Sequence, residues 1–157
     1  MTSAVYTAYE HSNYPLPELP RIKTMRLWDE LFTHESLPNS NAVLALLGEG
    51  ILSACVAEWL IDADPGLTHE ELQLRSKERI NPPLLSAFGD VYALPPLLQY
   101  AKLYPAAKQL SFKDVGTVFL AYIGAVHKDH GYEVTKDWIF ALMDWDNLTM
   151  LQSLQRD

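Results

Sequence analysis

The sequence has little cysteine and no excess of positive charge. Cys55 is its single cysteine, which excludes an intrachain disulfide and a cysteine-rich zinc site. The formal net charge is -8, whereas proteins that hold nucleic-acid phosphates depend on clustered lysine and arginine. We therefore expect RNA binding by the isolated chain to be weak. We also expect an intracellular, reducing compartment, with cytoplasm, nucleus and mitochondrion left open.

Signals for export, membrane insertion and β-structure are missing as well. The N-terminus carries Glu10 and no basic, apolar stretch typical of a signal peptide. No apolar run reaches the length that a membrane span needs, so no membrane partner is expected. No segment alternates polar and apolar residues as a half-buried strand does. Phosphate-binding glycine loops, CxxC pairs and the hydrolase motif Gly-x-Ser-x-Gly do not occur either.

Helical periodicity is what the sequence does contain. Trp28, Leu31 and Phe32 predict a short helix, and residues 43–61 predict a long, nearly apolar central helix. Thr68-x-x-Glu71 is a capping box, and an apolar helical pattern then runs from residue 84 to about Tyr104. A second box at Ser111 opens a helix that ends at Gly131, and Thr135 is expected to cap the last helix. The predicted fold class is all-α, a bundle of about six to eight helices.

The chain divides into three parts by composition. Residues 1–20 form an arm rich in proline and tyrosine, residues 21–146 a helical domain, and residues 147–157 a C-terminal tail. Prolines disfavour a regular helix in the arm. An ordered arm must rest on a surface, either that of its own domain or that of a neighbouring chain.

Three segments carry a resemblance to a known family. They are residues 33–36, Thr-His-Glu-Ser, residues 41–52, Asn-Ala-Val-Leu-Ala-Leu-Leu-Gly-Glu-Gly-Ile-Leu, and residues 119–126, Phe-Leu-Ala-Tyr-Ile-Gly-Ala-Val. Together they resemble the ribonuclease III endonuclease domain, whose signature reads roughly Glu-Arg-Leu-Glu-Phe-Leu-Gly-Asp-Ala-Val-Leu after Thr-His-x-Ser. The resemblance spans about residues 22–145 and implies that family's helical bundle. It leaves no room here for the double-stranded-RNA-binding domain that many members carry.

The same resemblance implies that most catalytic acids have been lost. Members of the family cleave RNA with divalent metal ions, which carboxylates from two helices hold. Alignment places Ala45 and Glu49 at the acid positions of the first motif, and Thr117 and Leu120 at those of the second. Only Glu49 keeps a carboxylate, so we expect no metal site, no cofactor and no intact catalytic site.

Asp114 is the one acid that could compensate. It lies one turn before Thr117 and so shares its helical face. Its simpler role is that of a cap residue near the start of the helix, where negative charge is favourable. His34 matches the histidine of Thr-His-x-Ser and is expected to be a hydrogen-bonded structural residue. His127 and His130 are expected to face solvent at the end of their helix and not to bind a metal.

Dimerisation is a further implication of the resemblance. Ribonuclease III domains pair through the signature helix, and the aromatic residue that enters the partner corresponds here to Leu46. With Leu47 and Ile51, it forms the predicted interface of a homodimer, or of a heterodimer with a ribonuclease III-like chain.

Three functions are consistent with these observations. The first is a non-catalytic ribonuclease III-like domain that dimerises and serves as a structural or partner-binding module in RNA processing or an RNA–protein complex. The second is a residual or partner-completed double-stranded-RNA endonuclease that uses Glu49 and Asp114 with Mg²⁺. The third is an all-α interaction protein unrelated to the family.

Overall fold

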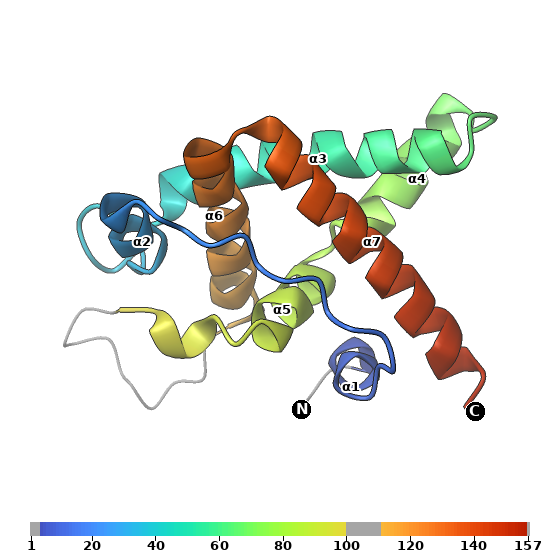
Figure 1. Cartoon of the computed structure of the whole chain (residues 1–157), viewed down its shortest axis with the longest axis horizontal. Coiled ribbons are helices and arrows are strands. Elements are labelled where there is room, and N and C mark those ends of the chain that lie inside the picture. Colours follow the sequence, from blue (N-terminus) through green and yellow to red (C-terminus); the bar gives the residue numbers. More distant parts are fainter. Residues whose placement is uncertain (1–3, 100–110, 157) are drawn as a thin grey trace.

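The computed structural model describes residues 4–99 and 111–156, and this part of the chain contains helices and no named strand. The elements are α1 (Ala4–Glu10), α2 (Met25–Leu31), α3 (Ala42–Ala63), α4 (His69–Arg79), α5 (Pro82–Val91), the short 3₁₀ helix η1 (Pro95–Leu97), α6 (Phe112–His130) and α7 (Tyr132–Leu154). The all-α prediction is therefore confirmed for the described residues. Figure 1 shows α6 crossing α3 at one end of the molecule and α7 running diagonally to the C-terminus.

Helices α3 and α6 pack very closely against each other, and two glycines make this contact possible. A Cβ atom on Gly48 would lie 1.8 Å from the carbonyl oxygen of Leu120, and one on Gly124 would lie 2.2 Å from that of Leu44. Both helices therefore touch backbone to backbone where glycine supplies no side chain. The pattern of small residues in the two sequence motifs is explained by this crossing.

The hydrophobic core surrounds that crossing. Phe88 of α5 and Phe119 of α6 are fully buried, with ring centroids 5.3 Å apart. Trp138 of α7 contacts Phe119 edge to face at 6.1 Å, a favoured arrangement of aromatic rings. Other buried residues from α3, α6 and α7 complete the core: Leu44, Leu52, Val56, Val118, Ile123, Ile139, Leu142 and Met143.

Local capping signals set the start of α4, as predicted, and also that of α5. At the start of α4, the backbone N–H of Glu71 donates to Thr68 Oγ1 at 3.2 Å, and the N–H of Thr68 donates to Glu71 Oε2 at 2.9 Å. The capping box is therefore confirmed. At the start of α5, Asn81 Oδ1 accepts from the N–H of Leu84 at 3.0 Å and Pro82 takes the first helical position, which suits a residue without an N–H.

Two helix boundaries differ from the prediction. The single helix expected from residue 84 to about Tyr104 is wrong, because α5 ends at Val91 and Ala93 adopts a left-handed φ of 54° before two prolines begin η1. Residues 100–104 of that expectation lie outside the described part. Thr135 does not cap α7, because the helix already begins at Tyr132 after Gly131, whose φ is 85°. The Thr135 hydroxyl instead donates to the carbonyl of Gly131 at 2.8 Å.

Helix α3 is longer and more apolar than the sequence analysis allowed. It has 22 residues and a mean hydropathy of 1.7 over its most apolar window, enough by length and composition alone to cross a membrane. The statement that no apolar run reaches this length is therefore wrong. The buried core helices of globular proteins can have the same length and apolar composition as a membrane span. In this fold α3 packs against α4, α6 and α7.

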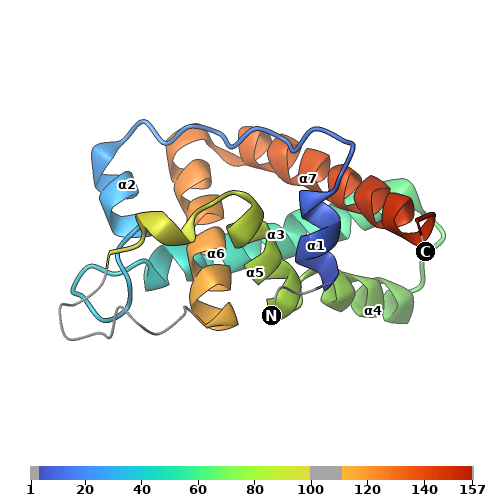
Figure 2. The ribbon, with the colours of Figure 1, turned by 90° about the horizontal axis from the view of Figure 1, so that it is seen from below.

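The N-terminal arm lies on the chain's own domain. Contrary to expectation, part of the arm is helical, because its prolines all follow α1. Tyr9 of α1 is buried between Phe88 and Trp145 at centroid distances of 5.5 and 4.7 Å. An extended segment then crosses α7 and α6 to reach α2, as the view from below shows (Figure 2). The predicted C-terminal tail is a continuation of α7 as far as Leu154.

Candidate functional site

The positions that the alignment assigns to the catalytic acids gather at the α3–α6 crossing. Gly48 touches the backbone of Leu120, Ala45 lies one turn before Gly48, and Glu49 follows it. Thr117 lies one turn before Leu120 on α6. The fold therefore brings together the positions on which a ribonuclease III site would be built.

The side chains at this crossing offer a single carboxylate. Ala45 is buried at 7% exposure, Thr117 and Leu120 are half-buried, and Glu49 is exposed to solvent. Mg²⁺ prefers several oxygen ligands in near-octahedral geometry. A methyl group, an isobutyl group and a hydroxyl cannot replace three carboxylates, so these residues do not fit the metal centre that a phosphodiesterase mechanism of this kind requires.

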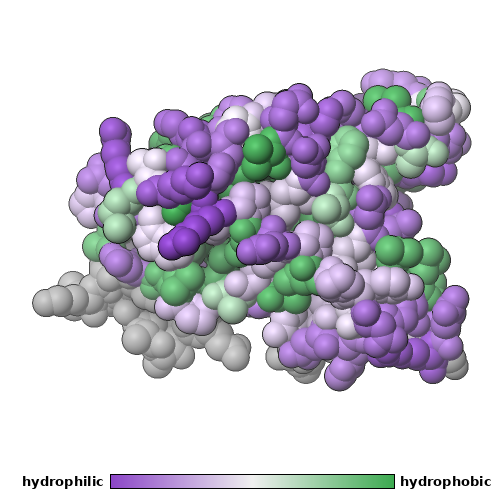
Figure 3. Space-filling view, in the orientation of Figure 1, coloured by the Kyte–Doolittle hydropathy of each residue, from purple (hydrophilic) through white to green (hydrophobic). Residues whose placement is uncertain are grey.

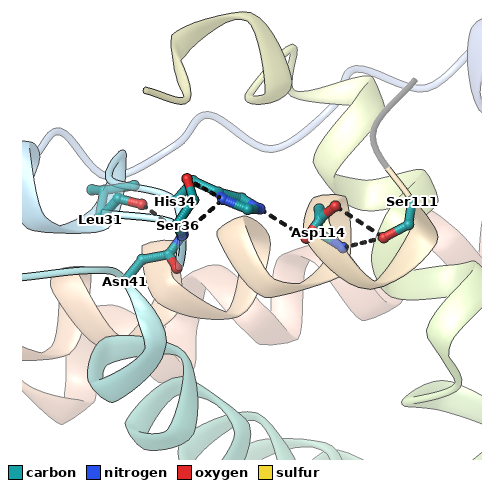
Figure 4. Close-up of polar contacts among 6 residues, drawn as sticks. All are labelled: Leu31, His34, Ser36, Asn41, Ser111 and Asp114. Atoms are coloured by element: carbon teal, nitrogen blue, oxygen red, sulfur yellow. Dashed lines mark hydrogen bonds and ion pairs between the residues drawn. The ribbon is translucent and has the colours of Figure 1, made fainter. Parts of the chain in front are cut away.

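Asp114 makes its hydrogen bonds to residues that are not on the crossing. Its Oδ1 lies 3.1 Å from His34 Nε2, and its Oδ2 accepts from Ser111 Oγ at 3.0 Å (Figure 4). Its backbone N–H donates to Ser111 Oγ at 3.2 Å. Asp114 is thus a cap-region residue that also joins α6 to the α2–α3 loop.

The tautomer of His34 follows from its neighbours. The backbone N–H of Ser36 donates to His34 Nδ1 at 3.1 Å, and Ser36 Oγ lies 2.9 Å from the same nitrogen. Because an N–H can only donate, Nδ1 must accept, and a neutral ring then carries its proton on Nε2. That proton is donated to Asp114, and the hydrogen bond connects the α2–α3 loop to α6. His34 is buried at 3% exposure, which agrees with the structural role expected from the sequence.

His34, Glu35 and Asp114 also form a cluster of possible metal ligands. One ligand atom from each lies within 4.8 Å of the others. Sequence reasoning missed this cluster because Asp114 is distant in the chain, and only the fold brings it to the loop. A histidine coordinates metals through an unprotonated nitrogen. Here Nδ1 accepts the Ser36 N–H and Nε2 carries the proton, so the cluster is better suited to hydrogen bonding than to holding a cation.

An exposed apolar stripe on α3 lies beside the crossing. Val43 and Leu46 are 73% and 72% exposed, and Leu47 is 37% exposed. The spacing i, i+3, i+4 puts all three on one helical face. Ile51, the third residue of the predicted dimer interface, is buried within the chain at 8% exposure and therefore offers little surface to a partner.

Solved structures with the same arrangement of helices include nuclease domains. The nuclease domain of ribonuclease III from Campylobacter jejuni aligns with a TM-score of 0.73 and 20% identity, over 80% of this chain and 90% of that one. A second crystal structure of that domain aligns at 0.70 and 18% identity, over 89% and 91% of the two chains. This chain has the ribonuclease III nuclease-domain fold.

Dicer from Pichia stipitis shares the ribonuclease III fold with this chain at a TM-score of 0.68 and 23% identity, over 91% of this chain and 63% of Dicer. No protein-family model and no curated protein sequence matches the chain. The shared fold speaks against the third alternative, an all-α interaction protein unrelated to the family.

A buried ionic group lies outside the crossing and was also missed by sequence reasoning. Asp146 of α7 is 3% exposed. It accepts from the hydroxyl of Tyr9 at 2.6 Å and from the guanidinium of Arg79 at 2.9 Å. Burial raises the pKa of Asp146 despite these donors. In this example of the ribonuclease III fold, the group ties the arm, α4 and α7 together.

Proposed function

We propose that this chain is a non-catalytic ribonuclease III-like domain that dimerises and acts as a structural or partner-binding module in RNA processing or an RNA–protein complex. The observation that carries the proposal is the combination found at the α3–α6 crossing. The positions assigned to catalytic acids hold Ala45, Thr117 and Leu120, while the adjacent face of α3 exposes Val43 and Leu46.

Exposure of these side chains favours association. Single exposed apolar residues are common on protein surfaces, but Val43, Leu46 and Leu47 form one stripe. Gly50 continues it, and a Cβ atom there would meet no atom within 4 Å. Burying one large aliphatic side chain contributes about 1.5–3 kcal/mol. A second copy or a related chain placed against this stripe would remove that surface from water. The crystallised nuclease domain of Campylobacter jejuni ribonuclease III is described as having a region involved in dimer formation, which supports the same arrangement.

Sedimentation analysis tests the proposal. We expect the natural chain to sediment as a dimer and Leu46→Asp to give monomers, because a charge buried in an apolar contact costs several kcal/mol. Leu154→Asp is the matched control, since Leu154 is 73% exposed near the end of α7 and Leu46 is 72% exposed. Both substitutions place a charge in solvent in the monomer, and only the first should change the mass. A natural chain that is monomeric at micromolar concentration would contradict the proposal.

The alternative function, a partner-completed endonuclease using Glu49 and Asp114, has less support. Both carboxylate oxygens of Asp114 are hydrogen-bonded, one to His34 and one to Ser111. A cation bound to Asp114 would have to share these oxygens with the groups that already donate to them, one of which holds the α2–α3 loop. Cleavage of double-stranded RNA by this chain mixed with an active ribonuclease III-like partner, but lost in Asp114→Asn, would favour this alternative.

A further inference from the structure

The outward face of α3 has a symmetric pattern of side-chain size. Its N-terminal half exposes large aliphatic residues, which are Val43, Leu46 and Leu47. Its C-terminal half presents small residues that are exposed or half-buried, which are Ser53, Ala54 and Ala57. Gly50 lies midway between the two sets. Positions 43 and 57, 46 and 54, and 47 and 53 are mirror images about it, so every large residue has a small counterpart.

This pattern is complementary to itself. In a dimer with two-fold symmetry, residue i of one copy contacts residue j of the other, and j contacts i. Two α3 helices that cross antiparallel at Gly50 would therefore bring each large residue opposite a small one. A parallel pair would set large residues against large ones and leave a gap between the small ones. Close packing favours the antiparallel pair. A Cβ atom on Gly50 would meet no atom of its own chain within 4 Å, which leaves the crossing point open.

The face of α3 is too narrow to hold two copies together by itself. Positions 43–57 span about 21 Å at a rise of 1.5 Å per residue, and a helix is about 10 Å wide, so the strip covers roughly 210 Å². A stable dimer typically buries about 800 Å² on each partner. The elements beside α3 must therefore contribute to the contact.

An acidic groove borders the N-terminal end of this face. Its charged lining residues are Asp29, Glu30 and Arg26 of α2, and Val43 connects it to α3. Two carboxylates and one guanidinium leave an excess of one negative charge. Within residues 4–99 and 111–156, neither Asp29 nor Glu30 takes part in a salt bridge. Both carboxylates are therefore available to a cation from another chain.

A second groove, which we call the α4 groove, borders the C-terminal end of the face. It lies between Ala57 of α3 and Leu72 and Ile80 on the side of α4, and it also contains Lys77 and His69. Lys77 makes no salt bridge within the described part of the chain. Helix α4 has no buried residue, so this groove is open to solvent. Its charge is opposite to that of the acidic groove.

We propose that a second copy of this chain occupies the face of α3 in an antiparallel arrangement, with the two-fold axis at Gly50. The same axis brings the acidic groove of each copy to the α4 groove of the other, because the two grooves border opposite ends of the face. Asp29 and Glu30 then pair with Lys77 of the other copy, twice in each dimer. This arrangement rests on the proposed dimerisation and specifies its partner, its register and the charges that select it.

A second copy fits this face better than an unrelated chain does. One symmetry operation matches both the sizes and the charges, whereas an unrelated partner would have to reproduce both patterns independently. Opposite charges across an interface select the partner and speed association more than they add affinity. On the side of the molecule that the arm crosses, hydrophobic residues instead lie in separate patches among hydrophilic ones (Figure 3).

Charge reversal tests the identity of the partner. Lys77→Glu, and separately the double variant Asp29→Lys with Glu30→Lys, should each raise the dissociation constant of the homodimer at least tenfold, or about 1.4 kcal/mol, because attraction becomes repulsion at two places. An equimolar mixture of the two variants should form a heterodimer with a dissociation constant within about threefold of the natural one, since both contacts again join opposite charges. Lys128→Glu is the control, because Lys128 is an exposed cation of α6 without a salt bridge in the described residues.

A size exchange tests the register. Leu46→Ala should weaken the dimer by leaving a gap, and Ala54→Leu should weaken it by overlap with Leu46 of the other copy. Ala54 is exposed, so the larger side chain does not enter the core of the monomer. The double variant restores a large residue opposite a small one, and its dissociation constant should return to within about threefold of the natural value. Leu46→Ala with Ala57→Leu is the matched control and should not recover, because position 57 mirrors position 43.

Sedimentation velocity with one component fluorescently labelled measures all of these dissociation constants, and circular dichroism checks that each variant is folded. A natural chain that remains monomeric would contradict the proposed dimerisation together with this arrangement. A natural dimer that is insensitive to Lys77→Glu, or charge-reversed variants that do not recover on mixing, would overturn the antiparallel arrangement alone. Absence of recovery in Leu46→Ala with Ala54→Leu would exclude the register, and a natural chain that pairs only with a different protein would exclude the second copy.

Discussion

Replacing Gly48 with alanine should disrupt the α3–α6 crossing. The added Cβ atom would lie 1.8 Å from the Leu120 carbonyl oxygen and 2.7 Å from its carbonyl carbon. Both atoms belong to the backbone in the middle of α6, so no side-chain rotation can relieve the overlap. Ordinary van der Waals contact needs about 3.5 Å, so the Cβ atom would overlap the carbonyl oxygen by roughly 1.7 Å and the helices would have to separate by about that distance. Interiors are packed too closely to absorb such a shift without loss of contacts elsewhere.

The cost can be estimated from this geometry. Overpacking a core usually costs about 1–3 kcal/mol, and more when backbone must move. Alanine also improves helix propensity over glycine by about 1 kcal/mol, which opposes the loss. Because the clash is with backbone, the cost lies at or above about 3 kcal/mol, and subtracting the gain in propensity leaves an expected net destabilisation of about 2 kcal/mol or more, a large fraction of the roughly 5–15 kcal/mol that stabilises a typical domain.

Gly50→Ala is the matched control on the same helix. A Cβ atom at Gly50 would meet no atom of the same chain within 4 Å, so within one protomer only the gain in propensity remains, about 0.5–1 kcal/mol. Urea denaturation followed by circular dichroism measures both variants. Two protein concentrations should be compared, because dimerisation makes apparent stability depend on concentration. Stability of Gly48→Ala within about 1 kcal/mol of the natural chain would refute the reasoning, because the magnitude rests on the backbone clash.

Three further predictions concern chemistry and pH. The isolated chain should not cleave double-stranded RNA with Mg²⁺ or Mn²⁺, and cleavage that Glu49→Gln abolishes would show the contrary. Millimolar Mg²⁺ should leave the melting temperature of the natural chain unchanged within about a degree, and a rise in that temperature would reveal a metal site elsewhere. The triple variant Ala45→Glu, Thr117→Asp and Leu120→Glu should be less stable by a few kcal/mol without metal and should be stabilised by Mg²⁺, because converging carboxylates repel one another until a cation binds. Burial raises the pKa of Asp146 in the folded protein, so the protonated carboxyl group is favoured there. Its contribution to the free energy of unfolding is therefore complete below the unfolded pKa of about 3.9 and is lost as pH rises through the folded pKa. Denaturation of Asp146→Asn and of the natural chain should be compared between roughly pH 3.5 and roughly pH 7. The stability of the variant relative to the natural chain should increase as pH rises, and a stability difference that does not change with pH would disprove a raised pKa at Asp146.

Features encoded within a few residues could be predicted from the sequence. The start of α4 depends on Thr68 and Glu71, which lie within one turn and bond to each other. The end of α6 at Gly131 depends on one residue that tolerates a φ of 85°. The apolar composition of α3 was sufficient to identify the central helix, although its length was underestimated at both ends. Spacing of small residues in two motifs also led to the correct fold.

The break after α5 shows where local reasoning failed. Apolar residues continue with helical spacing beyond Val91, yet Ala93 turns left-handed and Pro95 and Pro96 remove two N–H donors. The proline pair was visible in the sequence and outweighed the apolar pattern, because a missing N–H and a fixed φ stop a helix regardless of hydrophobicity. The start of α7 was misplaced for a related reason, since Gly131 ends one helix and begins the next.

The sequence by itself determined the helical class, the central helix, several caps and the loss of carboxylates at the positions aligned with catalytic acids. Only the tertiary structure decided which distant groups meet. Asp114 reaches His34, Asp146 reaches Tyr9 and Arg79, and the hydroxyl of Tyr122 reaches the carbonyl of Pro20 in the arm. Helix periodicity and capping act over one or two turns, so they specify elements. Contacts between elements depend on how whole helices pack. The need for glycine at position 48 is visible only in the folded chain, where the backbone of α6 approaches that of α3.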